Sequence, residues 1–234
     1  MSTPREFRQY RYAPPPGATE LVLVRHGESR AAVEGEEFDL VDGHGDPPLS
    51  EDGQAQAAQV GARLANERVD AIYVTSLRRT HETAAPLASQ LGIAPRVERD
   101  LREVFLGEWE GGTFRQKVAD QDPIAVQMFT EQRWDVIPGA EPSEEFTARV
   151  RGAIERIAAA HPDERVVVVS HGGTIGEILR QACGSEPWAF VGADNASVSH
   201  VVVNADGRWH VRRFNDTSHL DHELTVAPEP PAEL

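Results

Sequence analysis

Cysteine, long apolar runs and positive charge are all scarce in this chain of 234 residues. Cys183 is the only cysteine, so no disulfide can form within the chain, and nothing points to an oxidising compartment. No apolar run approaches the roughly 18 residues of a membrane-spanning helix, and no signal-peptide core follows the first residues. We therefore expect a cytoplasmic protein that does not enter a membrane.

Positive charge is outnumbered, with 23 lysines and arginines against 38 aspartates and glutamates and a formal net charge of −15. Such a surface repels nucleic acid and anionic lipid, so neither is an expected partner. Any anionic ligand would have to be held by a local cluster of cations. The composition is otherwise that of a globular protein, with 40% hydrophobic residues, and the length favours one domain or at most two.

Strand patterns alternate with helix patterns along most of the chain. The strand-like runs lie at 20–26, 70–76 and 166–170, and the helix-like patterns at 49–67, 77–92, 142–162 and 173–183. This alternation predicts an α/β three-layer sandwich, a mainly parallel sheet with helices on both faces. Two further strand-like segments around Asp206 and Gly207 predict a terminal hairpin.

The predicted domain runs from residue 20 to residue 220. Its segment from about 105 to 140 has no strong strand pattern, and we expect it to form a small insertion over the carboxyl ends of the strands. We expect residues 1–19 and 221–234 to be mobile.

Two predicted strands each end in a histidine. The run "LVLVRHGES" leads four apolar residues into Arg25 and His26, and "VVVVSHGGT" leads four valines towards His171. Ligands of parallel sheets bind beyond the carboxyl ends of the strands, and "TSLRR" places Arg79 after a third strand. These four side chains are therefore expected to converge on one cationic crevice.

An oxyanion is the natural partner for such a crevice, because unpaired polar groups at buried strand ends are costly. The backbone amides of Gly172, Gly173 and Thr174 open the following helix and could add donors and the positive end of its dipole. Each histidine taken alone is more often structural than catalytic. Their combination is what indicates a site.

A metal site is the competing interpretation. The candidate ligands are His26, Glu28, His44, Asp46 and His171. The guanidinium of Arg25, directly beside a ligand histidine, opposes a bound dication, and no HExxH or other close-set spacing is present. We therefore predict no metal ligand and no cofactor.

Six motifs together resemble the histidine phosphatase superfamily, which includes the cofactor-dependent phosphoglycerate mutases. In chain order they are "RHGES", "GHGDPPLSEDGQAQA", "TSLRRTHETA", "LREVFLGEWEG", "PGAEPSEEFTARV" and "VSHGG". The similarity extends from about residue 20 to residue 220, nearly a whole domain.

The resemblance implies a role for each of five residues. His26 matches the nucleophile, whose neutral imidazole attacks phosphorus, and its other ring nitrogen is expected to face a backbone carbonyl. Arg25 and Arg79 match the arginines that hold phosphate oxygens, and His171 matches the second histidine of the phosphate pocket. Glu103 matches the carboxyl group that protonates the leaving oxygen and then activates water.

Three further residues are expected to bind substrate, namely Gly172, His44 and Glu28. The sequence also departs from the family pattern where Asp42 precedes Gly43 and His44 in place of a frequent Gln-Gly-Trp. The carboxylate of Asp42 would lie near an anionic substrate, which argues against a bisphosphate. Many relatives carry Asn where this chain has Ala32, so one contact with substrate is missing or replaced.

A phosphatase is favoured over a mutase, because a mutase needs extra basic residues for a second phosphate. The region 109–138 offers only Arg115, Lys117 and Arg133. We expect a metal-independent phosphomonoester hydrolase, similar to the histidine acid phosphatases, that acts on a small phosphorylated metabolite through a phosphohistidine. A mutase, a non-catalytic protein that binds phosphorylated ligands and a metal-dependent hydrolase stay open as alternatives. The sequence does not determine the oligomeric state, and we expect a homodimer only because it is the commonest arrangement among soluble oligomers.

Overall fold

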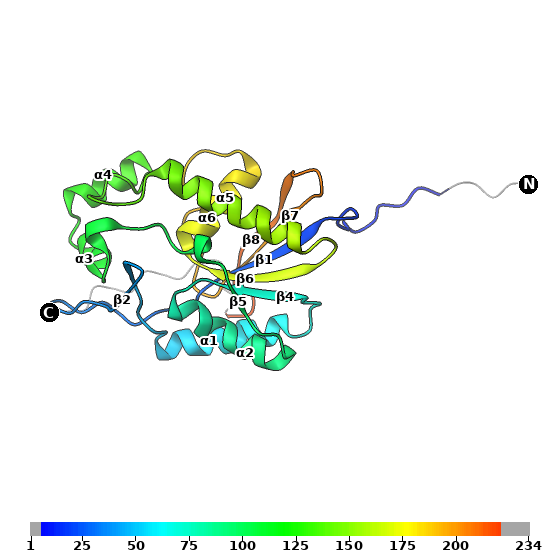
Figure 1. Ribbon diagram of the computed structural model, residues 1–234, viewed down its shortest axis with the longest axis horizontal. Helices are drawn as coiled ribbons and strands as arrows, with labels where there is room; N and C mark the ends of the chain where they lie inside the picture. The colour runs from blue at the N-terminus through cyan, green and yellow to red at the C-terminus, as the bar shows by residue number, and fades with distance from the viewer. Residues whose placement is uncertain (1–5, 221–234) are drawn as a thin grey trace, which may run out of the picture.

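A six-stranded sheet in the order β5-β4-β6-β1-β7-β8 forms the centre of the computed structural model, which describes residues 6–220 (Figure 1). The strands are β1 Thr19–Arg25, β4 Ala71–Val74, β5 Arg96–Val97, β6 Arg165–Ser170, β7 Val198–Val203 and β8 Trp209–Asp216. The pairs β1–β6, β6–β4 and β4–β5 are parallel, and the pairs β1–β7 and β7–β8 are antiparallel. The mainly parallel sheet and the terminal hairpin are therefore both confirmed.

Helices cover both faces of the sheet, as the alternating pattern predicted. They are α1 Glu51–Leu64, α2 Arg78–Leu91, α3 Thr113–Ala119, α4 Pro123–Glu131, α5 Ser143–Ala160 and α6 Gly172–Cys183. In Figure 1, α5 and α6 lie on one side of the sheet, and α1 and α2 lie on the other. The three-layer α/β sandwich is confirmed.

The valine run of β6 shows why the sheet needs two covered faces. Val166 and Val168 pack with residues of α5 and α6, whereas Val167 and Val169 pack with residues of α1 and α2. All four are at most 2% exposed. A continuous apolar run suits a strand that is buried on both faces, and each side chain stabilises the fold by about 1.5–3 kcal/mol.

Helix ends follow the signals read from the sequence. Ser50 caps α1, because its hydroxyl oxygen accepts a hydrogen bond from the Gly53 amide at 3.0 Å. Gly92 ends α2 in the left-handed conformation at φ 67°, which glycine adopts without strain. Helix α5 ends at Ala160, two residues before Pro162.

The long loop after β1 contains a small hairpin that the sequence analysis did not predict. It pairs β2 Leu40–Val41 with β3 His44–Gly45 through a turn at Asp42 and Gly43, where φ is 50° and 85°. Strands of two residues are too short to show periodicity. The Asp-Gly pair, which favours tight hairpin turns, was the available signal.

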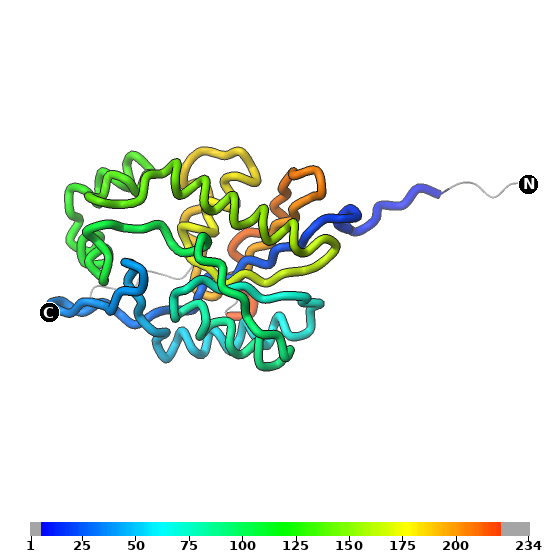
Figure 2. The backbone as a smooth tube through the Cα atoms, in the orientation of Figure 1, coloured from blue at the N-terminus to red at the C-terminus, as the bar shows by residue number. Residues whose placement is uncertain are grey.

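The segment from 105 to 140 packs around a small core of its own. It holds α3, α4 and a short helix at Gly107–Trp109, and its buried residues include Trp109, Met128 and Ile137. In Figure 2 this segment lies at the same end of the molecule as the loop after β1, beyond the carboxyl ends of the parallel strands. The predicted insertion over that end of the sheet is therefore present.

The chain outside the sandwich is described only in part. Residues 6–18 contain no helix or strand, and β1 begins at Thr19, one residue before the predicted domain start. The predicted mobility of 221–234 and of the first five residues concerns segments outside the described residues. Within residues 6–220, no helix combines the length and the apolar content that crossing a membrane requires.

Candidate active site

Residues that follow β1 and β4 line an inner pocket of about 210 Å³. Its charged lining residues are Arg25, His26, Arg79, Glu103, Glu110 and Arg115. The ring of His171, which follows β6, lies with its centroid 5.1 Å from that of His26. The structure thus brings together the four side chains that the sequence placed at strand ends.

His26 is held as a neutral imidazole in one tautomer. Its Nδ1 lies 2.7 Å from the carbonyl oxygen of Gly27, which can only accept, so Nδ1 carries the proton. Its Nε2 lies 3.2 Å from Nε of Arg79, which can only donate, so Nε2 presents its lone pair. Burial lowers the pKa of His26 well below its ordinary value, and the charges of Arg79 and Arg25 lower it further. The expected backbone acceptor is therefore present, and Nε2 is the ring nitrogen that carries a lone pair.

His171 is fully buried beside His26. Its Nε2 lies 3.1 Å from the hydroxyl of Thr75, and its Nδ1 has no hydrogen-bond partner among the described residues. Burial lowers the pKa of His171 well below its ordinary value, with Arg79 as the next cause. Nδ1 is therefore the ring atom left to meet a substrate oxygen.

The two arginines of the inner pocket are anchored by backbone carbonyls. Arg25 donates from Nη1 to Ala193 at 2.6 Å, and its buried Nε has no partner among the described residues. Arg79 donates from Nη1 to Gly45 at 2.9 Å. Burial lowers the pKa of Arg79 to about 10, which leaves it charged at neutral pH. Two anchored cations therefore line the inner pocket together with His26.

Glu103 occupies the helix N-terminus that we expected to bind substrate directly. Its Oε2 accepts from the amide of Gly173 at 2.9 Å, and its Oε1 accepts from the amides of Thr174 and Val104, both at 3.0 Å. The expectation for the three amides is corrected, because two of them hold this carboxylate and only that of Gly172 is left. The amides at the start of α6, together with the helix dipole, thus hold the carboxylate of Glu103 at the wall of the inner pocket.

Gly173 is required for this arrangement. A Cβ atom at position 173 would lie 2.6 Å from Oε1 of Glu103, closer than such contacts occur. The second glycine of "SHGG" therefore leaves room for the carboxylate.

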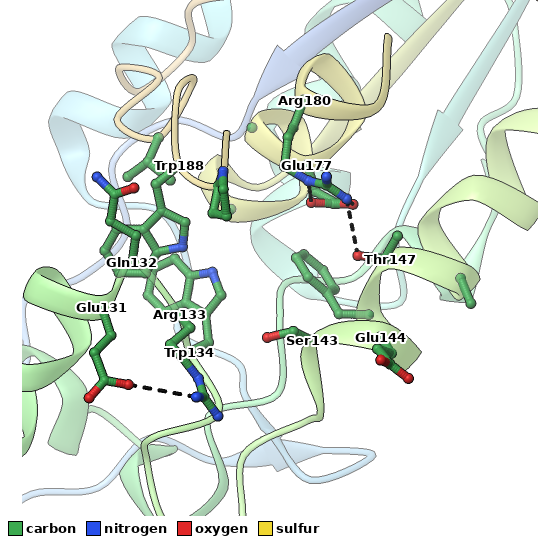
Figure 3. A pocket seen from close by; sticks show the side chains of 16 residues that line it. Glu131, Gln132, Arg133, Trp134, Ser143, Glu144, Thr147, Glu177, Arg180 and Trp188 are labelled. Carbon is green, nitrogen blue, oxygen red and sulfur yellow. Dashed lines mark hydrogen bonds and ion pairs between the residues drawn. The ribbon is translucent and has the colours of Figure 1, made fainter. Parts of the chain in front are cut away.

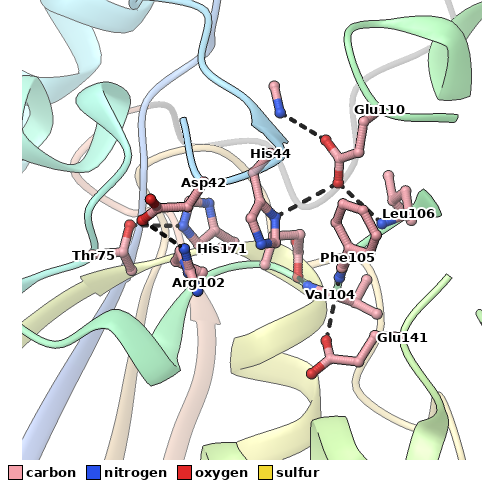
Figure 4. A network of polar contacts seen from close by, with 12 residues as sticks. Asp42, His44, Thr75, Arg102, Val104, Phe105, Leu106, Glu110, Glu141 and His171 are labelled. Atoms are coloured by element: carbon pink, nitrogen blue, oxygen red, sulfur yellow. Dashed lines mark hydrogen bonds and ion pairs between the residues drawn. The ribbon is translucent and has the colours of Figure 1, made fainter. Parts of the chain in front are cut away.

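His44 does not line the inner pocket, which corrects our expectation for it. Gly45 lines that pocket, whereas His44 lines a neighbouring cavity with Arg102 and Phe105. Its ring packs on Phe105 at 5.3 Å, and its Nδ1 lies 3.6 Å from Oε1 of Glu110 (Figure 4). Burial, with Arg102 as the next cause, lowers the pKa of His44 to about 4.

Asp42 also faces away from the inner pocket. Its carboxylate accepts a hydrogen bond from Arg99 at 2.8 Å. It accepts a second one from Arg102 at 3.0 Å (Figure 4). Two positive partners offset the charge that we expected to oppose a substrate.

An outer pocket of about 530 Å³ adjoins the inner one and shares Arg25, His26 and Arg115 with it. Glu28 lies here, as do Ser29, Gln116 and Asn195. From the sequence, Arg115 was only one of the few basic residues of the insertion. The seven residues of α3 are too few to show which face of the helix is buried, so the sequence does not place Arg115 at the site. It did not single out Asn195 or Glu110.

Glu110 is a second carboxylate of the inner pocket. It accepts hydrogen bonds from the amides of Gly45 at 2.7 Å and Leu106 at 3.0 Å, and burial raises its pKa.

Another cavity, of about 520 Å³, is lined by none of the predicted site side chains, although Gly173 borders it. Trp134 and Trp188 line it, as do Glu177 and Arg180 of α6 (Figure 3). The proposed metal ligands are not assembled either, since within residues 6–220 no three His, Cys, Asp or Glu side chains form a group that could hold a metal ion.

A family model described as the histidine phosphatase superfamily, branch 1, matches residues 21–217. The chain belongs to this superfamily. The match covers β1 to β8 and confirms the resemblance drawn from the six motifs.

Individual members of the histidine phosphatase superfamily resemble the chain over most of its length. Phosphoglycerate mutase-like protein 4 of Arabidopsis thaliana is 34% identical over 206 residues, which cover 86% of this chain and 87% of the relative. A metal-independent phosphoserine phosphatase of the same plant is 35% identical over 207 residues, with coverage of 86% and 83%. The native structure of a mycobacterial glucosyl-3-phosphoglycerate phosphatase superposes with a TM-score of 0.72 at 29% identity, covering 86% of this chain and all of that one.

Proposed function

We propose that the chain is a metal-independent phosphomonoester hydrolase that forms a phosphohistidine on His26. The observation that carries the proposal is the neutral imidazole of His26, whose Nε2 faces the guanidinium of Arg79 in a pocket that Arg25 also lines. The names of relatives support hydrolysis, since one is a phosphoserine phosphatase and another a glucosyl-3-phosphoglycerate phosphatase.

In the first step Nε2 of His26 attacks phosphorus, and the bond from phosphorus to the ester oxygen breaks. Arg25 and Arg79 hold the equatorial oxygens, and Nδ1 of His171 contacts a third. In the structure, the Nε–H group of Arg79 donates a hydrogen bond to Nε2 of His26. When the substrate binds, this group donates to a phosphate oxygen instead, and the lone pair of Nε2 becomes free. The leaving oxygen keeps the bonding pair and takes a proton from Glu103.

In the second step water attacks the phosphorus of the phosphohistidine. Glu103, now a carboxylate, accepts a proton from that water, and the P–N bond breaks. Inorganic phosphate leaves, and the bonding pair returns to Nε2. Glu103 is protonated again, so the cycle closes without a metal or a redox partner.

The basic side chains of the insertion favour hydrolysis over mutase chemistry. Lys117 pairs with Asp122 at 2.8 Å, and Arg133 pairs with Asp135 at 2.5 Å. Of the three, only Arg115 lines the pockets around His26. A second phosphate group would therefore contact only one of these basic side chains. A mutase needs more positive charge there, because it must hold and reorient a bisphosphorylated intermediate.

A quench experiment tests the mechanism. Mixing the enzyme with a radiolabelled phosphomonoester and stopping with alkali should trap about one phosphate per chain, labile to acid and lost in His26→Ala. Turnover should persist in EDTA. Phosphate trapped on serine, or turnover abolished by EDTA, would contradict the proposal.

Three further expectations stay predictions. These are the cytoplasmic location, the homodimer, and the absence of nucleic acid and membrane partners. The acidic net charge of −15 supports the last of them.

A further inference from the structure

The motif "PGAEPSEEFTARV" contributes a charged pair that lies outside both pockets around His26. Nε of Arg149, on α5, lies 2.6 Å from Oε1 of Glu141, and the two side chains are only 19% and 14% exposed. Neither residue lines the inner or the outer pocket. Removing two charges from water is costly unless further hydrogen bonds complete the pair, so the other contacts of these side chains indicate what the pair does.

The guanidinium of Arg149 uses all five of its N–H groups. Two of them donate to the carboxylate of Glu141, from Nε at 2.6 Å and from Nη2 at 2.9 Å. The other three donate to backbone carbonyls, those of Asp100 at 2.6 Å, Arg102 at 2.9 Å and Glu103 at 2.8 Å. Since a guanidinium has five donors, each of them meets an acceptor, and the fork is held in one orientation.

The backbone that receives these bonds has no regular structure of its own. Residues 102–106 form neither helix nor strand, so their polar groups must find partners elsewhere. The Leu101 carbonyl accepts from the hydroxyl of Ser170 at 2.8 Å, and the Arg102 carbonyl also accepts from the hydroxyl of Thr174 at 2.7 Å. The carbonyls of residues 100 to 103 are thus all held by side chains, three of them by one guanidinium.

Glu141 fixes the same segment on the other side of Glu103. Its amide donates to the carbonyl of Phe105 at 2.9 Å, and its Oε2 accepts from the amide of Phe105 at 3.3 Å (Figure 4). Arg149 therefore holds the backbone up to Glu103, and Glu141 holds the backbone just after it.

We infer that Arg149 and Glu141 are positioning residues for the general acid, because they hold the backbone from which the Glu103 side chain reaches the inner pocket. The inference rests on the proposed function. The Glu103 carboxylate is fixed at its far end by the amides of Gly173 and Thr174, and its backbone is fixed by the charged pair. Without Arg149, three carbonyls lose a donor, and the segment moves to recover hydrogen bonds elsewhere.

A ratio of two rates separates this role from a merely structural one. Ethyl phosphate has a leaving oxygen that needs a proton, whereas the leaving group of p-nitrophenyl phosphate needs little protonation. A displaced general acid therefore lowers kcat/KM for ethyl phosphate relative to kcat/KM for p-nitrophenyl phosphate. Weaker binding of phosphate, or a smaller folded fraction, lowers both values equally and leaves their ratio unchanged.

Two variants test the pair, and a third serves as the control. Arg149→Lys keeps the charge but loses the planar fork, and the ratio should fall by roughly 10- to 100-fold, as a displacement of about 1 Å can cause. Glu141→Gln replaces a charged acceptor by a neutral one, so the ratio should fall by up to about 10-fold. Arg151→Lys alters another arginine of α5, which pairs with Glu155 at 2.9 Å on the surface, and should leave the ratio unchanged.

A double variant shows whether Arg149 acts through Glu103. In the background of Glu103→Gln, where no carboxyl group is left to position, Arg149→Lys should cause no further fall in the ratio. Circular dichroism shows which variants fold. If Arg149→Lys does not fold, Glu141→Gln carries both measurements, because it keeps the arginine on the three carbonyls.

The outcomes separate the inference from the proposed function. A ratio that the folded variants do not change, or effects of Arg149→Lys and Glu103→Gln that multiply, would overturn the positioning role and leave the phosphatase standing. If Glu103→Gln itself leaves the ratio unchanged, Glu103 is not the general acid, and the inference fails with that assignment. If no phosphate is trapped on His26 of the unmodified protein, the proposed function fails, and the inference fails with it.

Discussion

The inner and outer pockets lie side by side but are built in different ways. In the inner pocket, buried side chains at strand ends are fixed by backbone groups, as His26 is by Gly27 and Arg79 is by Gly45. In the outer pocket, the exposed Glu28 and Arg115 come from a loop and a short helix. A rigid set of groups suits the phosphoryl group, which all substrates share. The more exposed charges suit the part of the substrate that varies.

Removing the nucleophile should have the largest effect, because nothing else in the inner pocket replaces it. His26→Ala should lower kcat at least about 10,000-fold, as loss of a nucleophile does in other hydrolases. The measurement is steady-state hydrolysis of p-nitrophenyl phosphate, with circular dichroism to show that the fold persists. Residual activity above about one hundredth would mean that another group attacks phosphorus.

Glu103→Gln should separate protonation of the leaving oxygen from the attack of His26 on phosphorus. For an alkyl phosphate, loss of the general acid should cost roughly 100- to 10,000-fold. For p-nitrophenyl phosphate, whose leaving group needs little protonation, a burst approaching one nitrophenol per site should precede slow turnover, because water activation is also impaired. An equal loss for both esters, without phosphoenzyme, would transfer the role to Glu110, the other carboxylate of the inner pocket.

The sequence predicts the strand-end residues of the inner pocket better than it predicts the residues of the outer pocket. The four valines before His171 and the apolar run before His26 indicate both the strands and the edge where their histidines meet. Glu103 was found only through the family motif, because the stretch around it has no periodicity. Arg115 was not assigned to the site, since its placement depends on contacts with Ser29 and Arg30, more than 80 residues away in the chain.

Gly173→Ala should have a smaller effect than Glu103→Gln, since it displaces the carboxylate without removing it. The added methyl would lie 2.6 Å from Oε1 of Glu103, and the flexible end of that side chain can move. A displacement of about 1 Å can cost up to about 100-fold, so kcat for an alkyl phosphate should fall within that range. Thermal unfolding should change little. Gly152→Ala on α5 is a suitable control, since its added methyl meets only the end of Arg156.

The last prediction concerns stability and not activity, because the buried histidines make the free energy of unfolding depend on pH. His26, His171 and His44 have lowered pKa values in the folded protein, whereas an unfolded histidine titrates near 6.5. Below about pH 6.5 the unfolded chain therefore binds protons that the folded chain does not. The free energy of unfolding should fall as the pH decreases, by up to about 1.4 kcal/mol per pH unit for each histidine, and these groups should add no slope above pH 7.5.

Urea unfolding at pH 5.0 to 8.0 measures that dependence. His171→Gln removes one of the three groups, so the slope below pH 6.5 should decrease by up to about 1.4 kcal/mol per pH unit, whatever its effect on stability at pH 8. An unchanged slope would show that His171 takes up its proton in the folded protein as readily as in the unfolded chain. His171 would then be positively charged at acidic pH, and the surroundings of His26 would carry one more positive charge than they do with a neutral His171.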